Sequence, residues 1–142
     1  MRLLMQKKIN ATLQSAAGAW HDLPIVLSHT PDDPLAVQLR ILVTEAEPPL
    51  ATWVFARDLL AAGLTAPSGE GDVRISPHGR EATDITLVSP QTWCVIRLPS
   101  SPVQDFIAGT HATAHHARHR IDTSLSHMLT KLLPQTAQNP DA

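Results

Sequence analysis

The sequence predicts one α+β domain, with about seven strands in antiparallel sheets and about three helices. Short apolar runs follow one another along the chain, and most of the twelve prolines fall where those runs break. Several runs have the period of two that is typical of half-buried strands, whereas helical spacing is found in only a few places. Strands in series, joined by short turns, favour an antiparallel meander, and 142 residues fit a single core.

The clearest strand is predicted over residues 37–43, where every second residue from Val37 onward is apolar. Its partner is predicted over residues 51–55, and the turn-forming residues 45–49 between them indicate a hairpin. Five further strands are predicted by pattern, over residues 9–13, 23–27, 72–76, 82–88 and 92–98.

A short helix is predicted directly after the hairpin, over residues 56–62, which are good helix formers. Asp58 lies in its first turn, where a negative charge is favourable, and Arg57 is expected to project outward. Gly63 is expected to end the helix in the left-handed conformation that glycine adopts readily.

A second helix is predicted to begin at Ser101. The Ser101 side chain is expected to cap it, Pro102 suits the first helical position, and Gln104 completes a capping box. Its expected buried face consists of three apolar residues, Val103, Phe106 and Ile107.

The third helix is predicted over residues 122–133, which carry a complete amphipathic stripe. Its apolar residues have the spacing i, i+3, i+4, i+7 and i+8, namely Leu125, Met128, Leu129, Leu132 and Leu133. This stripe suggests an oligomer, but periodicity leaves open whether it packs on its own sheet or on a neighbour. The polar residues 134–142 are expected to form a disordered tail.

Amino-acid composition indicates the cellular compartment and disfavours some classes of partner. Eleven Lys and Arg against thirteen Asp and Glu leave no excess of positive charge to neutralise a phosphate backbone, so nucleic acid is a poor partner. The single Cys94 cannot form an internal disulfide and is interpreted as a buried small hydrophobe. Neither a signal peptide nor an apolar run of about 20 residues is present, which favours a cytoplasmic protein without membrane insertion.

Searches for catalytic motifs predict no enzyme and no cofactor. The loop over residues 69–72 contains two glycines but opens a strand and carries two carboxylates, so it is interpreted as a turn and not as a phosphate site. Asp32 and Asp33 lie between prolines, which is ordinary turn chemistry. No serine lies in a G-x-S-x-G nucleophile elbow.

Four histidines gather over residues 111–119, and they are the weak candidates for a metal site. In a helix His111, His115 and His119 would share one face, where two of them could bind zinc or nickel. No Cys or carboxylate lies nearby to complete the ligand set. We therefore favour the interpretation that this stretch is a polar connection between two helices, which gains positive charge as pH falls.

Tryptophan and arginine residues are the candidates for protein contacts. Trp20 lies in a weakly patterned segment and is the best candidate for an exposed interface anchor. Arg57 and Arg74 are the other two candidates, because they could pair with carboxylates across a subunit boundary. The other large aromatic residues are expected in the core, namely Trp53, Trp93, Phe55 and Phe106.

One long block of this sequence resembles the signature of the SsgA-like proteins of filamentous actinobacteria. The block runs through TWVFARDLLAAGL at residues 52–64 and PSGEGDVRISP at residues 67–77. Residues 33–37 (DPLAV), 87–90 (LVSP) and 106–110 (FIAGT) are similar to the family segments D-P-Y-A-V, L-S-S-P and F-L-x-R-T. Leu35 and Gly109 differ from the family Tyr and Arg.

The resemblance implies a non-enzymatic regulator of sporulation and cell division that acts through protein–protein interaction. It further implies a fold like that of whirly-type single-stranded nucleic-acid binders, a homo-oligomer with a trimer favoured, and recruitment to division septa. The implied partner is the tubulin-like division protein FtsZ or another septum-placement factor. A whirly-like single-stranded nucleic-acid-binding protein is the alternative, which the mild negative charge disfavours.

The predicted domain spans residues 1–133, with the signature block at residues 52–77. Residues 111–133 form an atypical helical extension that departs from the family pattern, and residues 134–142 form the tail.

Overall fold

The computed structural model describes residues 4–44 and 47–111. Within these residues there are seven strands and two helices, α1 and a second helix over residues 100–111. In chain order the labelled elements are β1 (Met5–Ser15), β2 (Trp20–His29), β3 (Ala36–Ile41), β4 (Ala51–Ala56), α1 (Arg57–Gly63), β5 (Val73–His78), β6 (Ala82–Val88) and β7 (Trp93–Pro99).

All seven strands belong to one antiparallel sheet with the order β4-β3-β2-β1-β7-β6-β5. The α+β class and the seven strands are therefore confirmed. The sheet consists of two meanders, β1 to β4 and β5 to β7, which are joined by pairing of β1 with β7. The predicted third helix over residues 122–133 and the tail over residues 134–142 lie outside the described residues.

The strands β1 and β2 are much longer than the sequence predicts. They pair over ten positions, from Met5 with His29 to Gln14 with Trp20. Lysine, glutamine and asparagine occupy much of the outer face of β1, and such residues give little strand signal of their own. Cross-strand pairing with β2 therefore determines the length of β1.

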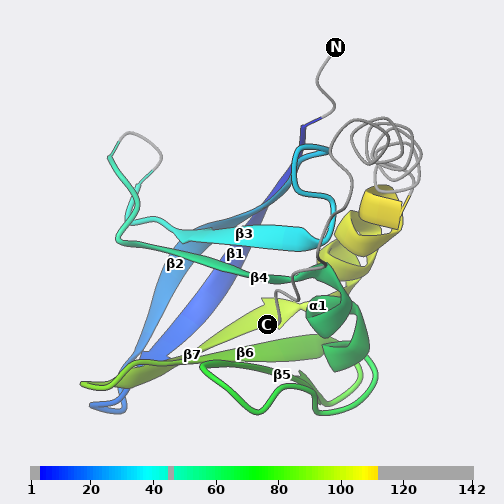
Figure 1. Ribbon diagram of the computed structural model, residues 1–142. Coiled ribbons are helices and arrows are strands. Elements are labelled where there is room, and N and C mark those ends of the chain that lie inside the picture. The colour runs from blue at the N-terminus through cyan, green and yellow to red at the C-terminus, as the bar shows by residue number, and fades with distance from the viewer. Residues whose placement is uncertain (1–3, 45–46, 112–142) are drawn as a thin grey trace, which may run out of the picture.

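The core lies inside the curled sheet, and both helices lie on the same side of the molecule, at the right in Figure 1. Each strand contributes every second residue to this core, as the period of two predicts. The row Leu13, Ile96, Ile85 and Ile75 crosses four strands in register and is representative of it.

The helix over residues 100–111 closes the core. Its three apolar residues Val103, Phe106 and Ile107 are buried, as predicted. The predicted start is wrong by one position, because Ser100 is already helical and Ser101 cannot be the cap. The Ser100 hydroxyl lies 2.7 Å from that of Thr83 in the core, and the Ser100 N–H donates to the Glu81 carbonyl, so these contacts fix the start of the helix.

Gly63 is needed for a close approach between elements, and the prediction that it caps α1 in the left-handed conformation is wrong. It is the last residue of α1, and the residue after it, Leu64, has a right-handed conformation with φ −70°. A Cβ atom at position 63 would collide with the side chain of Ile75 on β5. Glycine therefore allows α1 to pack directly on the sheet.

Two core predictions need correction. Trp93 is 43% exposed and lies on the outer face of β7, although its apolar neighbours predict a core residue. Cys94 packs against the core but is only half-buried, so it is less buried than its interpretation as a buried small hydrophobe predicts. Trp53 packs partly buried against the core, while Phe55 and Phe106 are buried as expected.

We expect the Cys94 thiol to react slowly with iodoacetamide in the native protein. Burial raises the pKa of the Cys94 thiol, which lowers the fraction of reactive thiolate at any given pH. The native state then holds the thiol proton more tightly than the unfolded state does. The free energy of unfolding should therefore fall as pH rises past the ordinary thiol pKa of about 8.5. A pH series of labelling rates, native and in urea, checks this; equal rates in both states would contradict it.

No helix among the described residues is long and apolar enough to cross a membrane.

Candidate protein-interaction surface

Two tryptophans lie exposed on the outer face of the sheet, opposite the core. Trp20 begins β2 and Trp93 begins β7, and each is 43% exposed. Exposed tryptophan is uncommon on a surface that makes no contacts, and aromatic residues are enriched at protein interfaces. We call the surface formed by Trp20, Trp93, Arg97 and Asp84 the tryptophan face.

Arg97 connects the strands of this face. Its Nε and Nη2 donate to the two carboxylate oxygens of Asp84 on β6, at 2.8 and 3.0 Å. The guanidinium also lies over Trp20, with Cζ 4.8 Å from the centre of the indole ring. Nδ1 of His78 on β5 lies 3.7 Å from Asp84, so the contacts extend across the sheet.

Electrostatics keep Arg97 charged and its side chain fixed in position. The hydrogen bond to Asp84 raises the pKa of the guanidinium above its ordinary value. A two-point Arg–carboxylate contact has a defined geometry, and stacking on Trp20 adds a cation–π contact of roughly 0.5–1 kcal/mol at an exposed site. Trp20 is therefore held against the sheet by Arg97, and the other face of its ring is available for contact with a partner.

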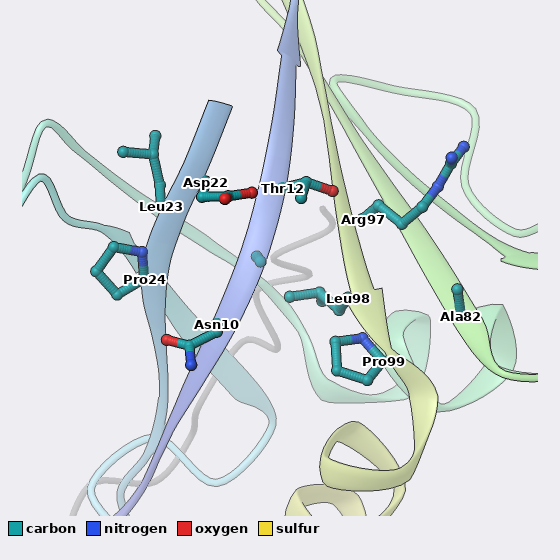
Figure 2. A pocket seen from close by; sticks show the side chains of 10 residues that line it. Asn10, Thr12, Asp22, Leu23, Pro24, Ala82, Arg97, Leu98 and Pro99 are labelled. Atoms are coloured by element: carbon teal, nitrogen blue, oxygen red, sulfur yellow. The ribbon is translucent and has the colours of Figure 1, made fainter. Parts of the chain in front are cut away.

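A hollow of about 640 Å³ lies next to Arg97, where β1 and β7 separate. Figure 2 shows Asn10 and Thr12 on β1 at its centre, Asp22 on β2 at one side, and Arg97 on β7 at the other, reaching away towards β6. The rest of its lining is mainly apolar, namely Ala11, Leu23, Pro24, Ala82, Leu98 and Pro99.

The hollow exists because the pairing of β1 with β7 is short. The ladder covers only Thr12–Ser15 of β1 and Cys94–Arg97 of β7, although β1 continues to Met5. Pro99 in β7 has no N–H to extend the ladder. The strands therefore diverge beyond Thr12.

The charges in and around the hollow favour binding of a polypeptide over a polyanion. Arg97 is neutralised by Asp84, and Asp22 adds a second carboxylate, so one positive charge faces two negative ones. Apolar walls with a few hydrogen-bonding groups are typical of protein–protein contact surfaces, and Trp20 stacks on Arg97, which lines the hollow. The lining holds no Cys or His that could act as a nucleophile or as a general base near neutral pH.

The structure places two of the three predicted contact residues on the same face of the sheet, without bringing them into contact. Trp20 and Arg74 lie on one outward-facing row that runs through Gln14, Val95 and Thr86. Four strand spacings separate them, which is about 19 Å. Arg74 is exposed, and its Nε donates to the carbonyl of Gly71 at 3.0 Å.

Arg57 is the third predicted residue, and the expectation that it projects outward is wrong. Only 6% of its side chain is exposed, and Nη1 lies 2.8 Å from Nδ1 of His111 while Nη2 donates to Asp58 at 3.1 Å. Arg57 therefore connects the start of α1 with the end of the helix over residues 100–111. It pairs with a carboxylate of its own chain.

The metal prediction remains largely outside the structure. His111 is the last described residue, and its Nδ1 faces Arg57, while His115 and His119 lie beyond the described part of the chain. The described residues contain no group of three or more potential metal-binding side chains.

Comparison with known proteins agrees with this fold. The family model for the Streptomyces sporulation and cell division protein SsgA matches residues 23–118, which is more than half of the chain. The chain belongs to the SsgA family. It is 37% identical over 116 residues to the sporulation-specific cell division protein SsgB of Streptomyces coelicolor, covering 77% of this chain and 83% of SsgB. It is 36% identical over 94 residues to SsgB of Thermobifida fusca, covering 63% of this chain and 67% of that protein.

Solved structures show the same architecture. The SsgA-like sporulation-specific cell division protein from Thermobifida fusca aligns with a TM-score of 0.74 and 29% identity, over 92% of this chain and 96% of that chain. A structure from work on SsgB mutations that correlate with longitudinal division during sporulation of Streptomyces coelicolor aligns with a TM-score of 0.70 and 30% identity, over 84% and 96%. The sequence resemblance to the SsgA-like family is thus confirmed.

Sequence reasoning missed Arg97 and Asp84 as members of the site. The period of two places both on the outer face of their strands, so their exposure was predictable. Their pairing depends on the register of β6 against β7, which sets Asp84 opposite Arg97. No local pattern in the sequence specifies that register.

Proposed function

We propose that this protein is a non-enzymatic regulator of sporulation-specific cell division that acts through protein–protein interaction. The observation that carries the proposal is the tryptophan face, where two indoles are exposed and one of them, Trp20, stacks on the guanidinium of the Arg97–Asp84 pair. The names of its relatives, sporulation-specific cell division proteins, support the process in which it takes part.

The proposed partner is FtsZ or another septum-placement factor. We propose that the protein is cytoplasmic and is recruited to division septa, where it binds this partner. A partner that inserts apolar side chains into the hollow and stacks on Trp20 fits the lining chemistry. We further propose that the protein works as a homo-oligomer, with a trimer favoured. Light scattering on the full chain measures the oligomer, and a fluorescent fusion in dividing cells measures the location.

We expect Trp20→Ala to weaken binding of the partner at least tenfold while the fold is retained. Truncation of a central aromatic anchor commonly costs 2 kcal/mol or more of binding free energy, and about 1.4 kcal/mol corresponds to tenfold. Pull-down of the host FtsZ and other division proteins by the wild-type and variant chains measures the change. The same variant, expressed in a deletion strain, should fail to restore septum placement.

Leu50→Ala is the matched control, because Leu50 is 62% exposed but lies in the β3–β4 connection, away from Trp20. It should bind and complement like the wild type. Equal binding by both variants would remove the tryptophan face from the proposal. Normal septation in the deletion strain, with no division protein captured by the wild-type chain, would overturn the proposed function itself.

The alternative of single-stranded nucleic-acid binding has less support. Such proteins combine stacking aromatic residues with an excess of positive charge along the strand. Trp20 offers a stacking surface, but the adjacent guanidinium is already paired with Asp84 and the chain has a net charge of −2. A gel-shift assay with single-stranded DNA at low salt should show no retention.

A further inference from the structure

A second surface, distinct from the tryptophan face, is a groove at the other end of the sheet that none of the described residues covers. The groove has a volume of about 330 Å³ and runs from Leu4, just before β1, across β2 and β3 to Val54 on the edge strand β4. Leu4 is 53% exposed and Val54 is 61% exposed within the described structure. We call it the Leu4–Val54 groove.

Two buried nitrogen atoms in the lining of this groove have no hydrogen-bond partner among the described residues. His29 is 1% exposed, and its Nε2–H donates to the Pro34 carbonyl at 2.8 Å, which leaves Nδ1 as an acceptor without a donor. Nε of Arg40 is a donor without an acceptor. Buried polar atoms are normally paired, so these two point to an occupant with hydrogen-bonding side chains.

The described chain ends near the Leu4 end of the groove. Gly109 lies so close to Met5 that a Cβ atom there would collide with the Met5 side chain, and Met5 directly follows Leu4. His111 contacts Arg57, three residues beyond Val54. The next 31 residues, 112–142, therefore start within a short distance of the groove.

We propose that residues 122–133 of the same chain bind in the Leu4–Val54 groove. The sequence of this segment has an apolar stripe, which is expected to be buried against another surface. The stripe consists of Leu125, Met128, Leu129, Leu132 and Leu133. The thirteen residues between His111 and Leu125 span up to about 40 Å when extended, which is ample for the return. The family match ends at residue 118, so this contact would be a feature of this chain's own extension.

Polar and charged groups match as well. The segment contains Ser126, which lies seven residues before Leu133 and therefore at the border of the apolar stripe, and its hydroxyl can donate to His29 Nδ1 or accept from Arg40 Nε. The residues that lead to it are basic, with Arg118 and Arg120 among histidines. Two exposed carboxylates carry the opposite charge, namely Asp33 in the groove lining and Asp58 beside Arg57.

Thiol labelling of the full chain tests the proposal. Val54→Cys in a Cys94→Ser background reports the accessibility of the groove to a maleimide. Adding Leu129→Asp, which places a charge in the apolar stripe, should raise the labelling rate about fivefold, as expected if the contact is occupied about four-fifths of the time. Thr130→Asp adds the same charge away from the stripe and should leave the rate within about twofold of the parent.

The dependence on protein concentration identifies the occupant. Protection of the introduced thiol that persists on dilution supports binding within one chain. Protection that is lost on dilution would overturn the proposal in favour of a second copy. A rate that Leu129→Asp does not change would overturn it entirely, because the groove would then be open to solvent.

A disulfide trap provides a measurement that does not depend on labelling rates. Val54→Cys combined with Leu129→Cys, again with Cys94→Ser, should oxidise to a cross-linked monomer. Arg74→Cys combined with Leu129→Cys is the matched control, because Arg74 is exposed on β5 at the far edge of the sheet. Equal cross-linking of both pairs, or cross-linked dimers only, would contradict docking within the chain.

Discussion

Phe106→Ala should lower the free energy of unfolding by about 3–5 kcal/mol, the usual range for removing a buried phenylalanine. Phe106 is fully buried in the helix over residues 100–111, where it packs into the core between the two meanders. The loss would be a large fraction of the roughly 5–15 kcal/mol that stabilises a typical domain. Urea denaturation followed by circular dichroism measures it.

Gln104→Ala in the same helix is the control, because Gln104 lies on the exposed face. Such surface substitutions usually change stability by less than about 0.5 kcal/mol. If the two variants unfolded at the same urea concentration, the helix over residues 100–111 would not be closing the core.

Gly63→Ala should destabilise the protein by about 2 kcal/mol, although alanine is the better helix former. Alanine gains roughly 1 kcal/mol of helix propensity over glycine, but inserting a methyl group into a packed core typically costs 1–3 kcal/mol, occasionally more. We expect a cost of about 3 kcal/mol at the upper end of that range, because the new Cβ would overlap the buried side chain of Ile75. Thermal or urea unfolding gives the net change.

Gly71→Ala is the comparison for Gly63→Ala, since a Cβ at position 71 meets no atom within 4 Å. Replacing glycine by alanine without strain stabilises proteins by about 0.4–1 kcal/mol through the unfolded state. The two substitutions should therefore change stability in opposite directions. A stabilising Gly63→Ala would show that α1 does not pack closely on β5.

Much of the fold was predictable because strand and turn signals are local. The prediction over residues 82–88 coincides with β6, and the hairpin of β3 and β4 was correct to within two residues at each end. The ends of β1 were missed because pairing with β2, and not the residues of β1 alone, makes that strand long. The start of the helix over residues 100–111 was missed for a related reason, since contacts of Ser100 with Thr83 and Glu81 fix it.

The candidate site was predictable only in part. Trp20 was identified as exposed because its segment has weak periodicity, whereas Trp93 was assigned to the core because apolar neighbours surround it. In a strand, an apolar run on an outer face looks the same as a buried one until the sheet's layers are known. Arg57 was assigned to the surface, yet it is covered where two helices far apart in sequence meet.

The sequence by itself determined the class of fold and the family, since the first depends on local periodicity and the second on a continuous block of residues. Only the tertiary structure decided that Arg97 pairs with Asp84 and stacks on Trp20, that Gly63 must be glycine, and that Arg57 is buried. These contacts join residues remote in sequence, and their geometry follows from strand register and helix packing, which are properties of the whole sheet.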